Sequence, residues 1–311
     1  MASILIELVK SARPRQSLKN LALLAPLIFS GNLFSLPNLA IAFYSLVTFS
    51  LLTAAVYLFN DIIDLPSDQA HPYKKNRPIA AGRIPISIAF FSSILIAFLA
   101  FYLALLNNFF FFLTCLVYLT LQIFYTLVLK KIVIIDVIAI ASGFSLRVYA
   151  GAFALDVHMS VWFLLCVVSL SLFLAVGKRR AELTVLTQAP TRKTLSHYSK
   201  EILDNYLAMF STSTWLSYAL FTFFEPPLLM FHEHPWLASL FIKFPSTLTG
   251  TNKWLMVTIP IVIFGIMRYT KIVYEGGKAE APERVLLSDK PLLGSAIIWG
   301  MLVVFVIYGL G

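Results

Sequence analysis

Charged residues are scarce in this sequence. Asp, Glu, Lys and Arg make up 13% of the 311 residues, whereas a soluble globular protein carries about 25%. Hydrophobic residues make up 59%, and the mean hydropathy is +0.84. These proportions exclude an ordinary soluble protein and indicate transmembrane helices. The long apolar runs do not alternate with period two, which argues against a transmembrane β-barrel.

Cysteine is also rare, and both cysteines, Cys115 and Cys166, fall inside apolar runs. An isolated cysteine in such a run behaves as a small buried hydrophobe, and two of them provide neither a metal site nor a disulfide framework. The first 20 residues are too polar for a cleavable signal peptide, so we expect none. No stretch resembles a soluble domain, and we predict a single membrane-embedded domain over residues 1–311.

Nine apolar runs are each close to the ~20 residues that a helix needs to cross the hydrocarbon core. Helices are expected because each satisfies its own backbone hydrogen bonds, as lipid requires. We therefore predict an all-α integral membrane protein, a bundle of nine transmembrane helices. The predicted spans are 17–35, 38–60, 86–106, 109–129, 133–155, 159–179, 204–224, 254–274 and 291–310.

Positive charge is unevenly distributed between the predicted loops. Of the 24 Lys and Arg residues, 21 lie in segments that share one side of the membrane, and the opposite loops hold only Lys243 and Lys253. Cytoplasmic loops carry an excess of Lys and Arg, so we predict a plasma (inner) membrane protein whose N-terminus and loops 61–85, 178–203 and 275–290 are cytoplasmic. Because the basic residues are dispersed over five loops, the net charge of +9 indicates contact with anionic lipid rather than nucleic acid.

A group of acidic residues ends the second predicted span. Asn60, Asp61, Asp64 and Asp68 fall within an arc of roughly 100° on one helix face, and a bend at Pro66 would put Asp68 just past the regular end. Carboxylates about 5–6 Å apart repel by about 3 kcal/mol per pair at an effective dielectric of ~20. A divalent cation removes this repulsion, and all-oxygen ligands favour Mg²⁺. We predict Mg²⁺ at these four residues; the alternative is a polar loop in solvent.

Basic residues follow directly, namely His71, Lys74, Lys75, Arg77 and Arg83. Anchoring on the cytoplasmic side accounts for Arg83, but only a short loop separates Lys74, Lys75 and Arg77 from the acidic face. A metal with neighbouring cations suits a diphosphate. We therefore predict a metal-bound diphosphate at the membrane edge, contacted by these three side chains.

A second group of polar residues belongs to the fourth and fifth predicted spans and to the loop between them. Tyr125, Lys130, Lys131 and Asp136 lie at their cytoplasmic end, and Arg147 lies ~16 Å deeper, near the helix face of Asp136. An Arg at that depth costs at least about 2.5–3.5 kcal/mol on insertion scales, so it must face the bundle interior and a partner. We predict that Arg147 meets a substrate phosphate or a network leading to one; a structural ion pair is the alternative.

A third basic group ends the sixth span in the sequence GKRRAEL. Anchoring on the cytoplasmic side is one explanation. The other, which we adopt for Lys178 and Arg179, is that consecutive cations beside a metal–phosphate site bind a further phosphate.

The segment NDIIDLPSDQAHPYKKNRPIAAGRI resembles the first aspartate-rich motif of the UbiA superfamily of intramembrane prenyltransferases. The segment RPRQSLKN at 13–20 resembles the same superfamily and adds Lys19 as a substrate-binding candidate. The resemblance covers essentially the whole chain and agrees with nine helices. It implies a membrane-embedded, Mg²⁺-dependent transferase.

Three more segments, DVIAIASGFSLRVYAGAFA, FLAVGKRRAEL and MRYTKIVYEGGKAEAPERVLLSDK, resemble one branch of the superfamily most closely. That branch joins 5-phosphoribosyl 1-diphosphate to a polyprenyl phosphate, such as decaprenyl phosphate, and releases diphosphate. Other branches usually carry a second metal motif, D-x-x-x-D, whereas here Asp136 is followed four residues later by Ile140. Fewer carboxylates and more Lys and Arg suit a substrate pair with three anionic groups.

The expected catalytic residues are Asp61, Asp64, Asp68, Lys130 and Arg147. The expected substrate-binding residues are Lys19, Lys74, Lys75, Arg77, Tyr125, Lys131, Asp136, Lys178 and Arg179.

Two alternative functions remain open from the sequence. One is a UbiA-type enzyme that prenylates an aromatic ring from a prenyl diphosphate at the same metal site. The other is a transporter of an anionic metabolite. Two observations argue against a transporter: the charged clusters lie on one side of the membrane, and Arg147 is the only charged residue deep in a span.

Overall fold

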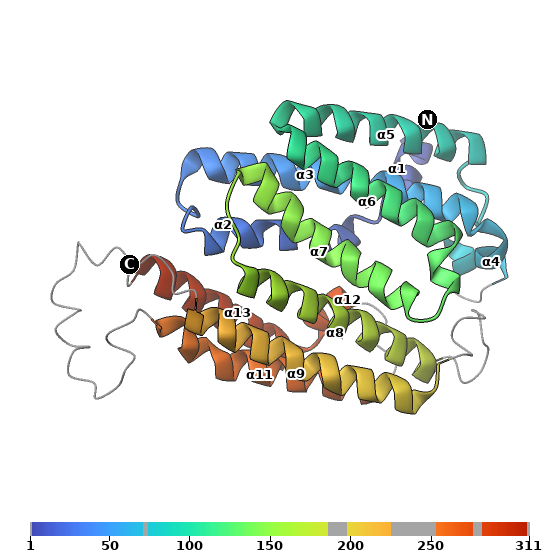
Figure 1. Cartoon of the computed structure of the whole chain (residues 1–311). Helices are drawn as coiled ribbons and strands as arrows, with labels where there is room; N and C mark the ends of the chain where they lie inside the picture. Colours follow the sequence, from blue (N-terminus) through green and yellow to red (C-terminus); the bar gives the residue numbers. More distant parts are fainter. Residues whose placement is uncertain (1, 71–73, 186–197, 225–252, 276–281, 310–311) are drawn as a thin grey trace, which may run out of the picture. The chain divides into compact units, whose positions relative to one another are not determined.

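Figure 1 shows the computed structural model, which describes residues 2–70, 74–185, 198–224, 253–275 and 282–309. The described residues form helices and turns without any strand, which confirms the predicted all-α class. The chain divides into two compact units. Of the described residues, 2–26 and 36–157 belong to the first unit, and 27–35, 158–185 and those from 198 onward belong to the second. That they act as one transferase domain stays a prediction.

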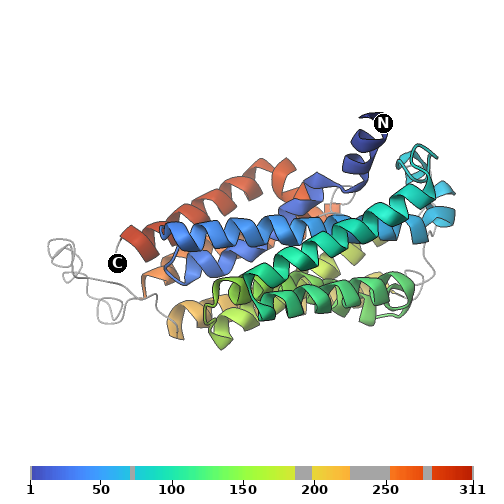
Figure 2. The same cartoon turned by 90° about the horizontal axis from the view of Figure 1, so that it is seen from above.

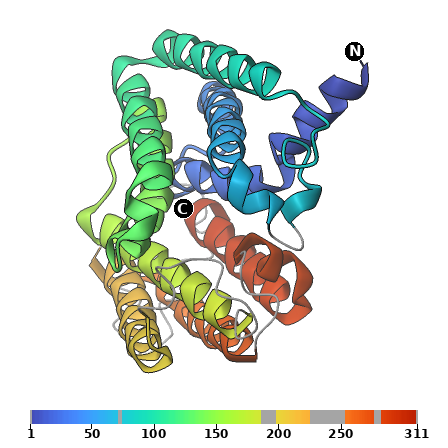
Figure 3. The ribbon, with the colours of Figure 1, turned by 90° about the vertical axis from the view of Figure 1, so that its right-hand side faces the viewer.

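The first unit is organised around the long helix α3 (Leu36–Ile63), which packs against α5, α6, α7 and the 3₁₀ helix η1. Figures 2 and 3 show α3 in blue running beside α5 in teal. The other elements of this unit are α1 (Ala2–Ser11), η1 (Pro14–Leu24), α4 (Leu65–Gln69), η2 (Lys74–Asn76), α5 (Ile86–Asn107), α6 (Phe109–Leu127), η3 (Leu129–Lys131) and α7 (Ile135–Leu155).

Asn108 shows why α5 and α6 meet in so short a turn. Its side-chain oxygen accepts from the Phe111 N–H at 2.7 Å, which caps the first turn of α6. Its side-chain amide donates to the Phe153 carbonyl at 2.7 Å, near the end of α7. One residue therefore fixes three helix ends.

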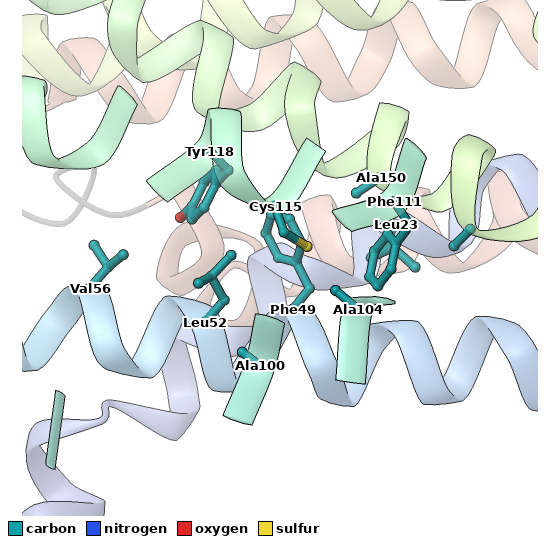
Figure 4. Close-up of a cluster of buried hydrophobic side chains, with 11 residues drawn as sticks. Leu23, Phe49, Leu52, Val56, Ala100, Ala104, Phe111, Cys115, Tyr118 and Ala150 are labelled. Atoms are coloured by element: carbon teal, nitrogen blue, oxygen red, sulfur yellow. The ribbon is translucent and has the colours of Figure 1, made fainter. Parts of the chain in front are cut away.

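The core of the first unit combines large and small side chains (Figure 4). Phe49 and Leu52 of α3 pack against Phe111 and Tyr118 of α6, and Leu23 of η1 belongs to the same buried cluster. Small residues complete it, namely Ala100, Ala104, Cys115, Ala150 and Ala154. In lipid, helices associate through van der Waals packing, and small residues let their backbones approach closely.

The predicted span 17–35 is wrong as a single helix. Residues 14–24 form the 3₁₀ helix η1, the short α2 (Ala25–Phe29) follows, and Gly31 then turns the chain with φ 76°. Pro26 is one physical reason, because proline lacks an N–H and clashes with the carbonyl four residues earlier in a continuing α-helix. Packing is another, because the Leu23 carbonyl lies so close to Gly151 of α7 that a Cβ there would sit 2.0 Å from its oxygen.

The second unit is built on α8 (Val161–Val185), which packs along α9 (Lys200–Phe224), and on α11 (Ile259–Glu275), which packs along α13 (Lys290–Val304). Phe29, Phe163 and Phe221 form ring contacts with centroids 4.9–5.5 Å apart. The remaining elements of this unit are η6 (Trp254–Thr258), α12 (Pro282–Ser288) and η7 (Phe305–Gly309).

Seven of the described helices are long and apolar enough to cross a membrane, so the predicted count of nine is not confirmed. Two of the nine predicted spans are not among these seven helices. The segment 17–35 is not one continuous helix, and 204–224 lies in α9, a 25-residue helix whose Ser, Thr and Asn residues reduce its hydropathy. Only 22% of the most apolar stretch of α5 is buried, and Leu95 and Phe98 are more than 70% exposed. Such surfaces suit lipid, and the chain is a multi-pass membrane protein.

Candidate active site

The aspartates lie where α3 ends. The Asp64 N–H donates to the Asn60 carbonyl at 2.9 Å, and the Asp68 N–H donates to the Asp64 carbonyl at 2.8 Å. The i to i+4 spacing therefore continues through the junction, although α3 stops at Ile63 and Asp64 has φ −83° and ψ 1°. Pro66 lies in the first turn of α4, so Asp68 falls past the regular end of α3, as predicted.

Each aspartate contacts a cation from a distant segment. Arg13 forms an ion pair with Asp61, and Lys130 pairs with Asp64 at 2.5 Å. One guanidinium nitrogen of Arg77 lies 3.1 Å from Asp61 and 2.5 Å from Asp68. Because a single nitrogen contacts both carboxylates, Asp61 and Asp68 face the same point. Both are buried, at 2% and 3% exposure.

These contacts offset the carboxylate repulsion in a way that the sequence did not predict. We expected a divalent cation to neutralise the aspartates, whereas here Arg13, Arg77 and Lys130 do so. Within the part of the chain that the structure describes, no three His, Cys, Asp or Glu side chains are grouped as metal ligands.

The donors nonetheless fit Mg²⁺, because Asp61 and Asp68 already share one cationic nitrogen. Mg²⁺ commonly binds through one or two carboxylates together with substrate phosphates. Metal binding by Asn60, Asp61, Asp64 and Asp68 stays a prediction.

Arg13 is a residue that our site prediction missed. It lies between α1 and η1 in the left-handed conformation, with φ 54° and ψ 59°, and the next residue is Pro14. Left-handed backbone is strained for a residue other than glycine. Its guanidinium lies 5.2 Å from the centre of the Tyr57 ring, one helical turn before Asp61. Burial lowers the pKa of Arg13, and the charge of Asp61 opposes that shift. The only signal in the sequence was the RPRQSLKN segment itself.

The residues around 125–136 form the second side of the site. The Thr126 hydroxyl contacts the Asn60 side-chain oxygen, which ties α6 to the end of α3. Lys130 and the exposed Lys131 lie in η3, and Asp136 is 1% exposed in the first turn of α7. Ile134 joins these elements with φ 71°, which is a rare conformation for a β-branched residue. The structure thus brings Lys130 to the aspartates.

The other candidates in the first unit are placed but not tested. Lys19 is half-buried in η1, Lys74 is half-buried in η2, and Lys75 is exposed beside it. Tyr125 is half-buried near the end of α6. Their binding of substrate, like that of Lys131 and Asp136, stays a prediction, and His71 lies outside the described residues.

Arg147 is buried in a network of neutral groups. It donates to the Asn20 side-chain oxygen and to the Tyr118 hydroxyl, each at 2.9 Å, and to the Gly143 carbonyl. Asn20 in turn donates to Ser50 and Thr53 of α3, each at 3.1 Å. Among the described residues no carboxylate pairs with Arg147, which is 5% exposed. A network is therefore present, and whether it leads to a phosphate stays a prediction.

Lys178 and Arg179 belong to the second unit and are described there. Arg179 is 1% exposed and pairs with Glu182 one turn further along α8, whereas Lys178 is half-buried. The neighbouring Arg180 pairs with Asp204 of α9 at 2.6 Å and lies over the Tyr274 ring. Phosphate binding by Lys178 and Arg179 stays a prediction.

Comparison with known proteins identifies a matching family and similar enzymes. The model of the UbiA prenyltransferase family matches residues 21–180. Decaprenyl-phosphate phosphoribosyltransferase of Corynebacterium glutamicum is 33% identical over 310 residues, which cover 97% of this chain and 86% of the relative. The enzyme of the same name from Mycobacterium tuberculosis is 32% identical over 307 residues, which cover 96% of this chain and 93% of the relative.

Solved structures share the fold at lower identity. A UbiA homologue from Archaeoglobus fulgidus, bound to GPP and Mg²⁺, superposes with a TM-score of 0.66 and 18% identity, covering 97% of this chain and 99% of that one. The same homologue has been solved with Cd²⁺, with a TM-score of 0.62. At this identity the likeness concerns the fold alone.

Proposed function

Because this chain belongs to the UbiA prenyltransferase family, we propose that it transfers the 5-phosphoribosyl group from 5-phosphoribosyl 1-diphosphate to a polyprenyl phosphate and releases diphosphate. The observation that carries this proposal is one-third identity, over nearly the whole chain, to decaprenyl-phosphate phosphoribosyltransferases. The clustered aspartates and cations at the end of α3 support it.

In the proposed reaction an oxygen of the acceptor phosphate attacks C1 of the ribosyl group. The bond from C1 to the diphosphate oxygen breaks, and the diphosphate leaves with the electron pair. Because the acceptor is already an anion, no strong general base is required. The aspartates are therefore assigned to cation binding rather than to proton abstraction.

Asp61 and Asp68 would hold Mg²⁺, with Asn60 and Asp64 completing its surroundings. When bound, the metal supplies neutralisation of the charge that develops on the departing diphosphate. Lys130 and Arg77 already lie at these carboxylates, so both are positioned to contact phosphate oxygens on the same side. Fixed cations of this kind stabilise developing negative charge without reorganisation.

The remaining proposed ligands hold the other phosphates and the ribose. In the first unit they are Lys19, Lys74, Lys75, Tyr125, Lys131, Asp136 and Arg147. Lys178 and Arg179 of the second unit are proposed separately as phosphate ligands. Three anionic groups require several cations, which the basic segments provide.

The lipid substrate enters from the bilayer, and the sugar diphosphate enters from the cytoplasm. This orientation follows from the excess of Lys and Arg in alternate loops. A cysteine placed at Ser67 should therefore react with an impermeant reagent only in opened cells, and labelling in sealed cells would reverse the orientation.

Mass spectrometry of the lipid product tests the function. Purified protein with 5-phosphoribosyl 1-diphosphate, Mg²⁺ and polyprenyl phosphate should yield lipid that carries one added phosphoribosyl group, with diphosphate released. A parallel reaction with a prenyl diphosphate and an aromatic acceptor should give no product. The proposal fails if only the parallel reaction proceeds.

A further inference from the structure

Arg13 and Arg77 occupy the carboxylates that the proposed metal needs. Arg13 contacts Asp61, and Arg77 contacts both Asp61 and Asp68. Both guanidinium groups lie at the same oxygen, Oδ1 of Asp61, and a divalent cation placed there would repel both of them. Metal binding must therefore move at least part of these guanidinium groups away from the aspartates.

Arg13 is held for this task by several independent features. Its left-handed backbone, with φ 54°, aims the side chain from the α1–η1 junction. The Tyr57 ring supports the guanidinium 5.2 Å from the ring centre. Arg13 and Asp61 are separated by 48 positions in the sequence, so their pairing reflects the packing of α3 beside η1. Strained backbone at such a position is typical of a functional residue.

We propose that Arg13 and Arg77 are exchangeable counter-ions, which neutralise Asp61 and Asp68 in the substrate-free protein and move onto phosphate oxygens when a divalent cation takes the carboxylates. This inference rests on the proposed function for the identity of its ligand, a metal-bound diphosphate. Metal alone would have to separate the guanidinium groups from their partners with no anion to receive them. Metal and diphosphate together provide a new partner for every charge, so they bind cooperatively.

If the counter-ions exchange, Arg13→Gln should change the affinity for metal and the affinity for diphosphate in opposite directions. Without substrate, Mn²⁺ alone should bind about tenfold more tightly than to wild type, because a competitor for Asp61 is removed. With saturating Mg²⁺, inorganic diphosphate should bind about tenfold more weakly, because a phosphate ligand is lost. A purely structural arginine would weaken both or change neither.

Arg83→Gln is the matched control. It removes the same charge from the same unit, but Arg83 pairs with Glu7 and the Asn76 carbonyl rather than with the aspartates. Both affinities should stay within about twofold of wild type, since the Arg83 side chain is 49% exposed and its charge pairs with Glu7. Equal effects of the two substitutions would mean that net charge, and not exchange, explains the result.

The measurements use the full-length protein in detergent. Electron paramagnetic resonance reports free Mn²⁺, calorimetry reports diphosphate binding at saturating Mg²⁺, and thermal unfolding verifies that each variant is folded. Should Arg13→Gln not fold, Arg13→Lys should shift both affinities in the same directions by less, because an ammonium lacks the guanidinium fork. Tighter Mn²⁺ binding with weaker diphosphate binding supports the exchange, and any other combination overturns it.

Neither ligand contains a ribosyl group or a lipid, so this test is separate from the proposed function. If the affinities change as expected but no phosphoribosyl lipid forms, the exchange holds and the substrate assignment fails. If the lipid forms while Arg13→Gln leaves both affinities unchanged, the function holds and the exchange fails.

Discussion

Arginine–carboxylate pairs occur in both units, but their arrangement differs. In the second unit Arg180 of α8 pairs with Asp204 of α9, and Arg268 of α11 pairs with Asp289 before α13. Each of these pairs joins neighbouring helices. Asp289 also accepts from the Leu292 N–H at 2.9 Å, so the same carboxylate caps α13.

In the first unit the carboxylates are crowded instead. Asp61, Asp64 and Asp68 lie within two helical turns, and Arg77 contacts two of them. Separate pairs gain by staying together, whereas crowded carboxylates remain repulsive unless cations surround them. The comparison suggests that a one-to-one pair stabilises the fold and that a crowded group is suited to exchange its cations for a ligand.

We expect the largest loss of activity when a crowded aspartate of the first unit is replaced. Asp61→Asn should reduce phosphoribosyl transfer by about a hundredfold or more, which is about 2.7 kcal/mol, because a metal ligand is lost while the side-chain shape is kept. Asp64→Ala and Asp68→Ala should also nearly abolish transfer. Radiolabel from the sugar diphosphate into lipid measures the rate.

Asp204→Asn is the control for that experiment. It breaks the pair between α8 and α9 and should reduce the melting temperature by about 2–4 °C, with the rate per folded molecule within about twofold of wild type. If Asp61→Asn retained about a tenth of the activity, a deficit of only ~1.4 kcal/mol, the aspartates would not be the metal site.

Arg147 tests a third arrangement, a buried cation with neutral partners. Arg147→Met should reduce kcat/KM by more than about tenfold, or ~1.4 kcal/mol. It should also destabilise the protein by about 1–3 kcal/mol for each buried acceptor left unpaired, since Asn20 and Tyr118 lose a donor.

Arg147→Lys should be intermediate in both measurements, because one ammonium replaces a fork of donors. Kinetics for each substrate, made on the folded fraction, distinguish the two roles. A wild-type kcat/KM for the Met variant would show that Arg147 acts only in the fold.

Gly151 in the first unit and Gly177 in the second differ in the space that is available for a side chain. A Cβ on Gly151 would lie 2.0 Å from the Leu23 carbonyl oxygen, whereas a Cβ on Gly177 would lie 2.9 Å from the Tyr269 ring. A ring can rotate away, but a backbone carbonyl can move only with η1. Gly151→Ala should therefore destabilise the protein by about 1–3 kcal/mol and more than Gly177→Ala does, as measured by thermal unfolding. Equal losses would mean that η1 adapts easily.

The smallest expected effect concerns Asp289. Its hydrogen bond with Arg268 holds the pKa of Asp289 below the usual value. A depressed pKa stabilises the folded state above the unfolded pKa of about 3.9, and this contribution is lost as pH falls through the folded value. The melting-temperature difference between wild type and Asp289→Asn should be constant at neutral pH and vanish in acid. A difference that grows in acid would contradict the pairing.

Much of the helical framework could be predicted from the sequence. The predicted 86–106 matches α5 (Ile86–Asn107), and 109–129 matches α6 (Phe109–Leu127). Apolar runs identify such helices because lipid permits few other structures. The spacing of Asn60, Asp61, Asp64 and Asp68 was equally local, since one or two helical turns separate them.

The wrong prediction for 17–35 shows that hydropathy does not determine the backbone conformation of an apolar segment. Its hydropathy resembles that of a spanning helix, but the segment contains Pro26, and its Leu23 carbonyl packs closely against Gly151, more than a hundred residues away. Hydropathy measures transfer into lipid and contains no information about how closely two backbones approach.

The sequence by itself determined the membrane class, most helices and the acidic arc, because each depends on residues within a few turns of one another. Only the tertiary structure decided which cations reach that arc. Arg13 and Lys130 are 48 and 66 positions from their aspartates, and they meet them because η1 packs against α3 and η3 packs against α6 and α7. Coulomb attraction acts over a few ångströms in space, and a sequence does not state which distant residues the fold brings within that range.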